Sequence, residues 1–198
     1  MQFPLQYPLT LSFKIAAFAP QFSVRDANGN LIAYVKQKLF KLKEAVTVFA
    51  DEQQTQPLYT LNADRIIDFS ALYHFADPQG VSLGSVKRQG MRSLWKASYD
   101  IMDGDRVAMT IREENPWVKV IDALLNEVPI LGLFSGYLFH PAYLVSRADG
   151  AVVVRMEKQP AFFEGKFAVE KKGLLNEAEE KRVLLSLIML LLLERTRG

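Results

Sequence analysis

Two stretches of the sequence concentrate basic side chains at spacings that could bind an anion. The first, KQKLFKLK, carries Lys36, Lys38, Lys41 and Lys43, and Glu44 is the acid that adjoins them. Arginine binds phosphate through two parallel hydrogen bonds and lysine binds it as a point charge, so basic clusters of this kind are typical of phosphate sites. The second, SVKRQGMRSLWK, adds Lys87, Arg88, Arg92 and Lys96.

Two basic hairpins at the same end of a fold would hold a phosphorylated ligand or an anionic lipid headgroup. A lysine or arginine close to an anionic leaflet contributes about 1 kcal/mol to membrane binding. The alternative is that both stretches are solvated strand faces, whose charges discourage pairing between sheet edges. The sequence leaves both interpretations open.

The other candidates for chemistry have simpler structural explanations. His74 and His140 are the only histidines, and neither has partners at metal-ligand spacing. His74 alternates with apolar neighbours in LYHFAD, which predicts a strand residue. Ser135 in GLFSGY lies one place late for a nucleophile elbow.

Acidic and aromatic residues also fit structural roles. Asp100, Asp103 and Asp105 depart from the calcium-loop spacing, and Asp103-Gly104 is typical of a turn. Glu113-Glu114 precedes a predicted helix, where negative charge is favourable. The aromatic residues form no stacking platform beside the basic stretches, so nucleic-acid binding is not supported. We expect no catalytic residue, no metal site and no cofactor.

Composition predicts a folded chain in a reducing compartment. The 198 residues, 49% hydrophobic and 23% charged, suit one domain over residues 1–198. The net charge of +2 implies no whole-molecule attraction to nucleic acid or membrane. The absence of cysteine fits the cytoplasm. The N-terminal stretch lacks a basic region and contains Pro4, Pro8 and Lys14, so it predicts an arm and first strand instead of a signal peptide.

The elements that must position the basic stretches include a helix with no polar face. Between Val183 and Leu193 only Ser186 interrupts an apolar run, which is too short to span a membrane comfortably and is bounded by charged residues. Asn176 and Glu179 form a capping-box pattern at its start. Apolar protein must therefore surround this helix; a short membrane tail anchor is the alternative.

The rest of the chain is mainly strand-like. Asn28-Gly29 predicts a two-residue hairpin turn, and similar turn signals recur at residues 77–80, 103–104 and 149–150. Together with the stretches beside these turns, the chain contains about twelve strand candidates. A barrel of that size has a lumen about wide enough for one helix. We therefore predict a mainly β (α+β) fold, a closed barrel of about twelve strands around the C-terminal helix, with a second, amphipathic helix near residues 115–126.

This arrangement resembles the tubby C-terminal-like superfamily, which includes tubby proteins, phospholipid scramblases and LURP-one-related proteins. The local likeness, to the LURP-one-related type, lies in VRDANGNLIAYVKQKLFKLKEAVTVFAD followed by PLYTLNADRI. The resemblance implies the barrel fold and, by analogy with tubby domains, phosphoinositide binding through basic residues. The chain departs from scramblases in having no cysteine cluster and no recognisable acidic calcium segment.

These observations together predict a non-enzymatic binding module, monomeric or weakly associating. Its expected partner is an anionic membrane surface, a phosphoinositide or another phosphorylated ligand, met in the cytoplasm or peripherally at the membrane. A protein-interaction scaffold that binds no lipid is the second hypothesis. The eight basic residues named above are the predicted site.

Overall fold

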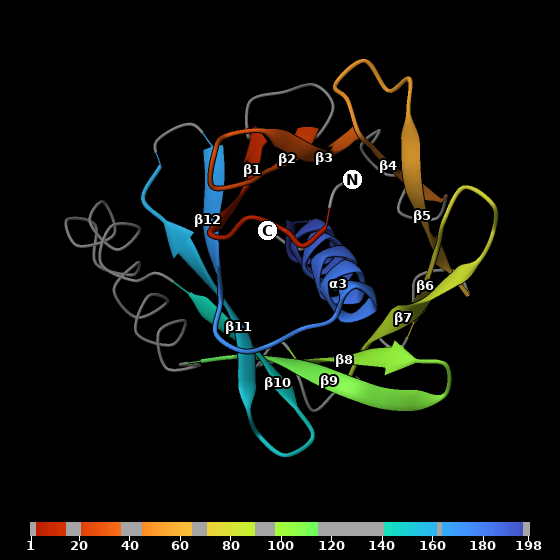
Figure 1. Cartoon of the computed structure of the whole chain (residues 1–198), viewed down its shortest axis with the longest axis vertical. Coiled ribbons are helices and arrows are strands. Elements are labelled where there is room, and N and C mark those ends of the chain that lie inside the picture. The colour runs from red at the N-terminus through yellow and green to blue at the C-terminus, as the bar shows by residue number, and fades with distance from the viewer. Residues whose placement is uncertain are drawn as a thin grey trace, which may run out of the picture.

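The strands close into a barrel around a single helix (Figure 1). A computed structural model of the chain describes residues 3–14, 21–36, 45–64, 71–89, 98–114, 141–161 and 164–195. The strands are β1 (Leu9–Lys14), β2 (Gln21–Arg25), β3 (Leu31–Lys36), β4 (Val46–Phe49), β5 (Pro57–Ala63), β6 (Leu72–Ala76), β7 (Ser82–Arg88), β8 (Ser98–Asp103), β9 (Arg106–Glu113), β10 (Ala142–Arg147), β11 (Val152–Gln159) and β12 (Glu164–Lys171), followed by α3 (Glu177–Arg195).

Every strand pairs with its sequence neighbours in antiparallel fashion, and β1 pairs with β12 to close the ring. The alternation of side chains along each strand supplies the inner wall. In β2, for example, Phe22 and Val24 are buried while Ser23 is only half-buried. The predicted closed barrel of about twelve strands is confirmed.

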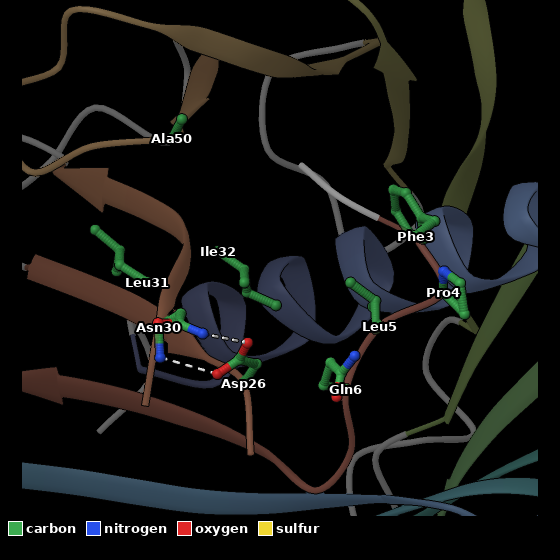
Figure 2. A pocket seen from close by; sticks show the side chains of 9 residues that line it. All are labelled: Phe3, Pro4, Leu5, Gln6, Asp26, Asn30, Leu31, Ile32 and Ala50. Atoms are coloured by element: carbon green, nitrogen blue, oxygen red, sulfur yellow. Dashed lines mark hydrogen bonds between the residues drawn. The ribbon is translucent and has the colours of Figure 1, made fainter. Parts of the chain in front are cut away.

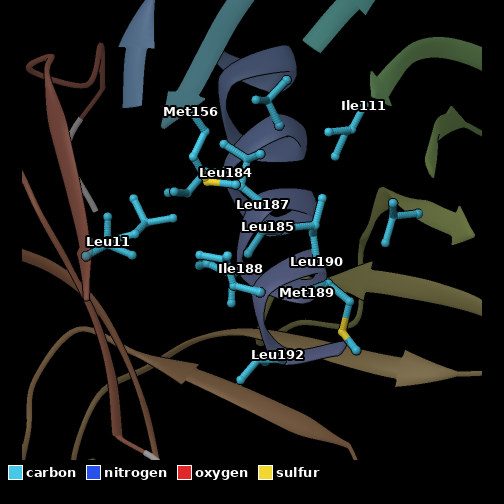
Figure 3. Packing of buried hydrophobic residues seen from close by; sticks show 14 of the residues in the cluster. Leu11, Ile111, Met156, Leu184, Leu185, Leu187, Ile188, Met189, Leu190 and Leu192 are labelled. Carbon is cyan, nitrogen blue, oxygen red and sulfur yellow. The ribbon is translucent and has the colours of Figure 1, made fainter. Parts of the chain in front are cut away.

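The helix α3 fills the lumen. Its residues from Val183 to Leu192 are all buried, including Ser186, whose hydroxyl donates a hydrogen bond to the backbone carbonyl of Arg182. Leu11, Ile111 and Met156 approach it from three different strands (Figure 3). Each large apolar side chain buried in this way contributes roughly 1.5–3 kcal/mol, which explains why a helix without a polar face is stable here.

The start of α3 is capped as predicted. The Glu179 backbone N–H donates to Asn176 Oδ1 at 2.9 Å, and the Asn176 backbone N–H donates to Glu179 Oε2 at 3.0 Å. Glu179 also accepts hydrogen bonds from Arg147 at the end of β10. Glu179 therefore takes part in capping the helix and also connects it to the barrel wall.

Two charged residues of the first helical turns, which bound the apolar run, are buried. Glu180 is 1% exposed and accepts hydrogen bonds from Lys171 and from the Leu5 backbone N–H. Arg182 is 7% exposed; its Nε donates to the Leu83 carbonyl at 3.0 Å and its guanidinium lies 2.8 Å from Asp103 Oδ1. The barrel wall and the N-terminal arm supply the partners that solvent would otherwise provide.

Three hairpin turns share one backbone hydrogen-bond pattern. The N–H of the first residue donates to the carbonyl of the fifth, and the carbonyl of the first residue accepts from the N–H of the fourth, a glycine. The turns are residues 26–30, 77–81 and 147–151, with Gly29, Gly80 and Gly150 at φ values of +83°, +82° and +86°. The turn at Asn28-Gly29 is longer than the predicted two-residue turn, because Asp26 Oδ1 accepts hydrogen bonds from the Asn28 and Asn30 backbone N–H groups.

The amphipathic helix predicted near residues 115–126 lies outside the described residues, as do His140 and Ser135. Within the described ranges, no helix combines the length and the apolar character that crossing a membrane requires.

Candidate functional site

The antiparallel order gives the barrel two different ends. Strands β1, β3, β5, β7, β9 and β11 all finish at one end, which we call the basic end, and the five hairpin turns between β2 and β11 lie at the other, the acidic end. The arm of residues 3–8 and the start of α3 also lie at the acidic end, because the Leu5 N–H binds Glu180 there.

Exposed basic side chains mark the basic end. Lys36 is the last residue of β3 and Lys87 lies one place before the end of β7, and both side chains are exposed. Lys14 at the end of β1 and Arg112 near the end of β9 are exposed at the same end. The two predicted basic stretches therefore leave the barrel at one end, as a shared anion-binding surface requires.

Lys36 and Lys87 are nevertheless well separated along the wall. Strands β4, β5 and β6 lie between β3 and β7, which makes four strand spacings. At about 4.8 Å for each spacing, the two strands are about 19 Å apart along the wall. These two lysines cannot hold one phosphate between them, and they suit a broad anionic surface better.

Arg88 differs from its neighbour Lys87 because alternation turns it towards the lumen. Its guanidinium lies 5.9 Å from the centroid of the Tyr99 ring, and Tyr99 is fully buried. Burial raises the pKa of Tyr73 on β6, as does the nearby Asp64 carboxylate, while the positive charge of Arg88 lowers it. Arg88 therefore lies among inward-facing tyrosines at the basic end.

Asp100 is the acid nearest to Lys87 in the strand register, on the facing strand β8. Its carboxylate accepts a hydrogen bond of 2.7 Å from the Gln89 side chain, which in turn accepts one from the Ser98 hydroxyl. This small network closes the start of the connection between β7 and β8. The remaining predicted site residues, Lys38, Lys41, Lys43, Arg92 and Lys96, lie outside the described residues.

The acidic end carries at least one aspartate in each of its five hairpin turns. These residues are Asp26, Asp51, Asp77, Asp103, Asp105 and Asp149. The carboxylates hold the turns: hydrogen bonds lower the pKa of Asp26, most strongly the one from the Asn30 side chain. Hydrogen bonds also lower the pKa of Asp51, led by the one from the Thr55 backbone N–H. These carboxylates are therefore ionised at neutral pH.

A buried polar cluster at the acidic end has a structural role that sequence reasoning missed. Glu180 accepts from Lys171, whose ammonium group lies 5.7 Å from the Tyr7 ring centroid. Burial raises the pKa of Tyr7, and the negative charge of Glu180 raises it further. The cluster fixes the N-terminal arm across this end, and no spacing pattern in the sequence could have revealed it.

His74 is a strand residue, as predicted: it lies on β6 with its side chain exposed. Asp103-Gly104 forms a turn, also as predicted, with Gly104 at a φ of +60°. In the part of the chain that the structure describes, no three His, Asp or Glu side chains gather as a set that could hold a metal ion.

The closed barrel around the C-terminal helix is the fold that the resemblance to LURP-one-related proteins implies. The chain belongs to the LURP-one-related family, whose model matches residues 31–170. A solved protein from Arabidopsis thaliana is similar to it in structure, with 17% sequence identity and a TM-score of 0.49 over 97% of this chain and 93% of that one. No curated protein matches the sequence.

Proposed function

We infer that the chain is a non-enzymatic binding module whose basic end meets an anionic lipid surface. The observation that carries this proposal is the exposure of Lys36 and Lys87 at one barrel end, from which the two basic stretches continue. The LURP-one-related fold is consistent with a binding domain. Lys38, Lys41 and Lys43 follow Lys36 in the sequence, and Arg92 and Lys96 follow Lys87, so we propose them as further members of the site.

The separation of the lysines favours a surface over a single small ligand. Charges about 19 Å apart along the wall exceed the Debye length of about 8 Å at physiological ionic strength, so they act on separate headgroups. The opposite charge of the turns at the other end would keep that end away from the membrane. The barrel would therefore lie with its basic end against the bilayer.

A binding role, instead of a catalytic one, is supported by the structural use of several charged side chains, among them the buried Glu180 and Arg182 and the half-buried Glu179. Glu180, Arg182 and Glu179 are all committed to fixing α3 to the wall and to the N-terminal arm. The carboxylates of Asp26 and Asp51 are committed to their turns.

Co-sedimentation with liposomes tests the proposal. Neutral phosphatidylcholine vesicles are compared with vesicles that also contain phosphatidylserine or a phosphoinositide, at low and at near-physiological salt. The double variant K36A/K87A should bind anionic vesicles about thirtyfold more weakly, since each lysine contributes about 1 kcal/mol. Soluble inositol hexakisphosphate, added as a competitor, distinguishes recognition of a phosphorylated headgroup from attraction to surface charge alone.

The matched control is R106A/K172A, which removes two exposed positive charges from the acidic end. It should bind as the unmodified chain does. Equal loss in both double variants would mean that net charge, and not the basic end, determines binding. Absence of binding to every vesicle at both salt concentrations would exclude the lipid surface and favour the protein-interaction scaffold.

A further inference from the structure

The barrel is closed, but among the described residues the pairing of β3 with β4 is the shortest in it and leaves an opening towards the acidic end. Among the described residues these two strands are paired at a single position of the sheet register, with Tyr34 opposite Phe49. Every other neighbouring pair of strands matches at four to six positions. The start of β3 and the chain that follows β4 therefore face each other at the acidic end without a matched ladder. An unmatched strand edge is a template for another strand.

A cavity of about 360 Å³ occupies this opening. Figure 2 shows its two walls, the N-terminal arm on one side and the β2–β3 hairpin on the other, with Ala50 beyond the end of β4. Its lining residues are Phe3, Pro4, Leu5, Gln6, Asp26, Asn30, Leu31, Ile32 and Ala50. Phe3 and Ile32 pack against the core cluster, to which Leu5 belongs, so the floor of the cavity is apolar.

The charge at the rim of the cavity is negative. Asp26 lines it, and its pKa is lowered mainly by the hydrogen bond from the Asn30 side chain, so the carboxylate is ionised at neutral pH. Asp51 and Glu52 follow Ala50 directly in the sequence. Arg25, the nearest basic residue in the hairpin, is engaged by Glu52 at 3.3 Å and by the Gly29 carbonyl. No lysine or arginine is among the lining residues.

We propose that this opening is a docking site for an extended peptide segment of a partner protein, with an apolar side chain in the cavity and an adjacent lysine or arginine beside Asp26. Strand addition at a sheet edge supplies backbone hydrogen bonds, and pockets for alternate side chains supply specificity. The cavity is near the small end of the range for ligand pockets, about 300–1,000 Å³, which suits one or two side chains.

The charge of the rim decides the class of the occupant. A carboxylate at the mouth repels an anionic headgroup and attracts a cationic side chain. The cavity lies at the acidic end, opposite the basic end that we assign to the lipid surface. A docked peptide and a membrane could therefore be bound at the same time, and the two proposals stand or fall separately.

Selection from a random eight-residue peptide library displayed on phage tests the proposal, with the purified full chain as bait. The selected peptides are synthesised with a fluorescent label, and their binding is measured by fluorescence polarisation. Ala50→Trp and Gln6→Trp each fill the cavity, from opposite walls. Ala27→Trp is the matched control, because Ala27 is exposed in the same hairpin and does not line the cavity. Thermal unfolding of each variant shows that it is folded.

The expected result is enrichment of peptides that place a large apolar residue next to lysine or arginine. Their binding should weaken roughly tenfold to a hundredfold in Ala50→Trp and Gln6→Trp, the factor that one buried apolar side chain supplies, and stay unchanged in Ala27→Trp. Asp26→Asn, which keeps an acceptor for the turn, should weaken binding severalfold and reduce its dependence on salt, while Asp51 and Glu52 keep their charges.

Three results would overturn the proposal: no enrichment above background, enrichment of acidic peptides, or selected peptides that bind both cavity-filled variants as well as the unmodified chain. Vesicle binding through the basic end is measured on the same variants. If it persists in Ala50→Trp, failure at the cavity is distinguished from failure of the proposed function.

Discussion

Gly84→Ala tests how α3 is held in the barrel. Gly84 lies on β7 beside the buried Arg182, with a φ of +112°. A Cβ atom there would lie 2.5 Å from the Met102 carbonyl oxygen and 2.6 Å from Arg182 Nε. The carbonyl belongs to the backbone of the neighbouring strand β8, so both that strand and the side chain of Arg182 must shift to accept the new Cβ atom.

The expected loss has two parts. An alanine held at positive φ costs about 1–2 kcal/mol. Moving Arg182 breaks its hydrogen bond to the Leu83 carbonyl and its contact with Asp103, and a hydrogen bond to a charged group contributes about 1.5–3 kcal/mol. Together these parts predict that Gly84→Ala lowers the free energy of unfolding by at least about 2.5–5 kcal/mol, measured by urea denaturation followed by circular dichroism.

Gly80→Ala is the matched control, because Gly80 also has a positive φ, +82°, and a Cβ there meets nothing within 4 Å. It should cost only the backbone part, about 1–2 kcal/mol. If the two variants lose the same stability, the contact between Arg182 and the wall does not fix the helix, and our account of its anchoring is wrong.

Two further predictions concern the helix. Leu187→Ala, which removes a side chain that is 1% exposed, should cost about 2–5 kcal/mol in urea denaturation, whereas Leu174→Ala, at a side chain that is 90% exposed, should cost almost nothing; equal effects would contradict the enclosed helix. The hydrogen bond from Arg147 lowers the pKa of Glu179 from 4.5, so the folded state binds this proton less tightly than the unfolded state and its contribution to stability is lost as the pH falls below about 4.5. Glu179→Gln, which can still cap the helix, should be about 1 kcal/mol less stable at pH 7 and should lose less stability than the unmodified chain on acidification; an unchanged acid profile would show that the ion pair does not contribute.

The sequence predicts most of this fold because its strongest signals are local or unambiguous. The run from Val183 to Leu193 has no polar face, so it needs apolar surroundings, and the number of strands fits a barrel that can enclose one helix. Asn176 and Glu179 mark the helix start by their spacing alone. Alternation along the strands then assigns the inner and outer faces.

The sequence could not show how the helix is anchored. Glu180 and Arg182 are typical of a solvated first turn, and their burial depends on partners at the other ends of long sequence separations, such as Leu5 and Leu83. The weak match between β3 and β4, and the cavity it leaves, follow from the register of two strands, which composition does not set. The sequence placed Lys36 and Lys87 in one predicted site but could not give their separation along the wall.

The most direct test of the central claim is to find which end of the barrel meets an anionic membrane. The chain has no cysteine, so single cysteines can carry an environment-sensitive fluorophore. Asn62→Cys places it near the basic end and Gln79→Cys places it in a turn at the acidic end, and both native side chains are exposed. With vesicles that contain phosphatidylserine or a phosphoinositide, we predict a blue shift for the label at position 62 and none at position 79. A shift at position 79 alone, or no shift at either position, would contradict the account.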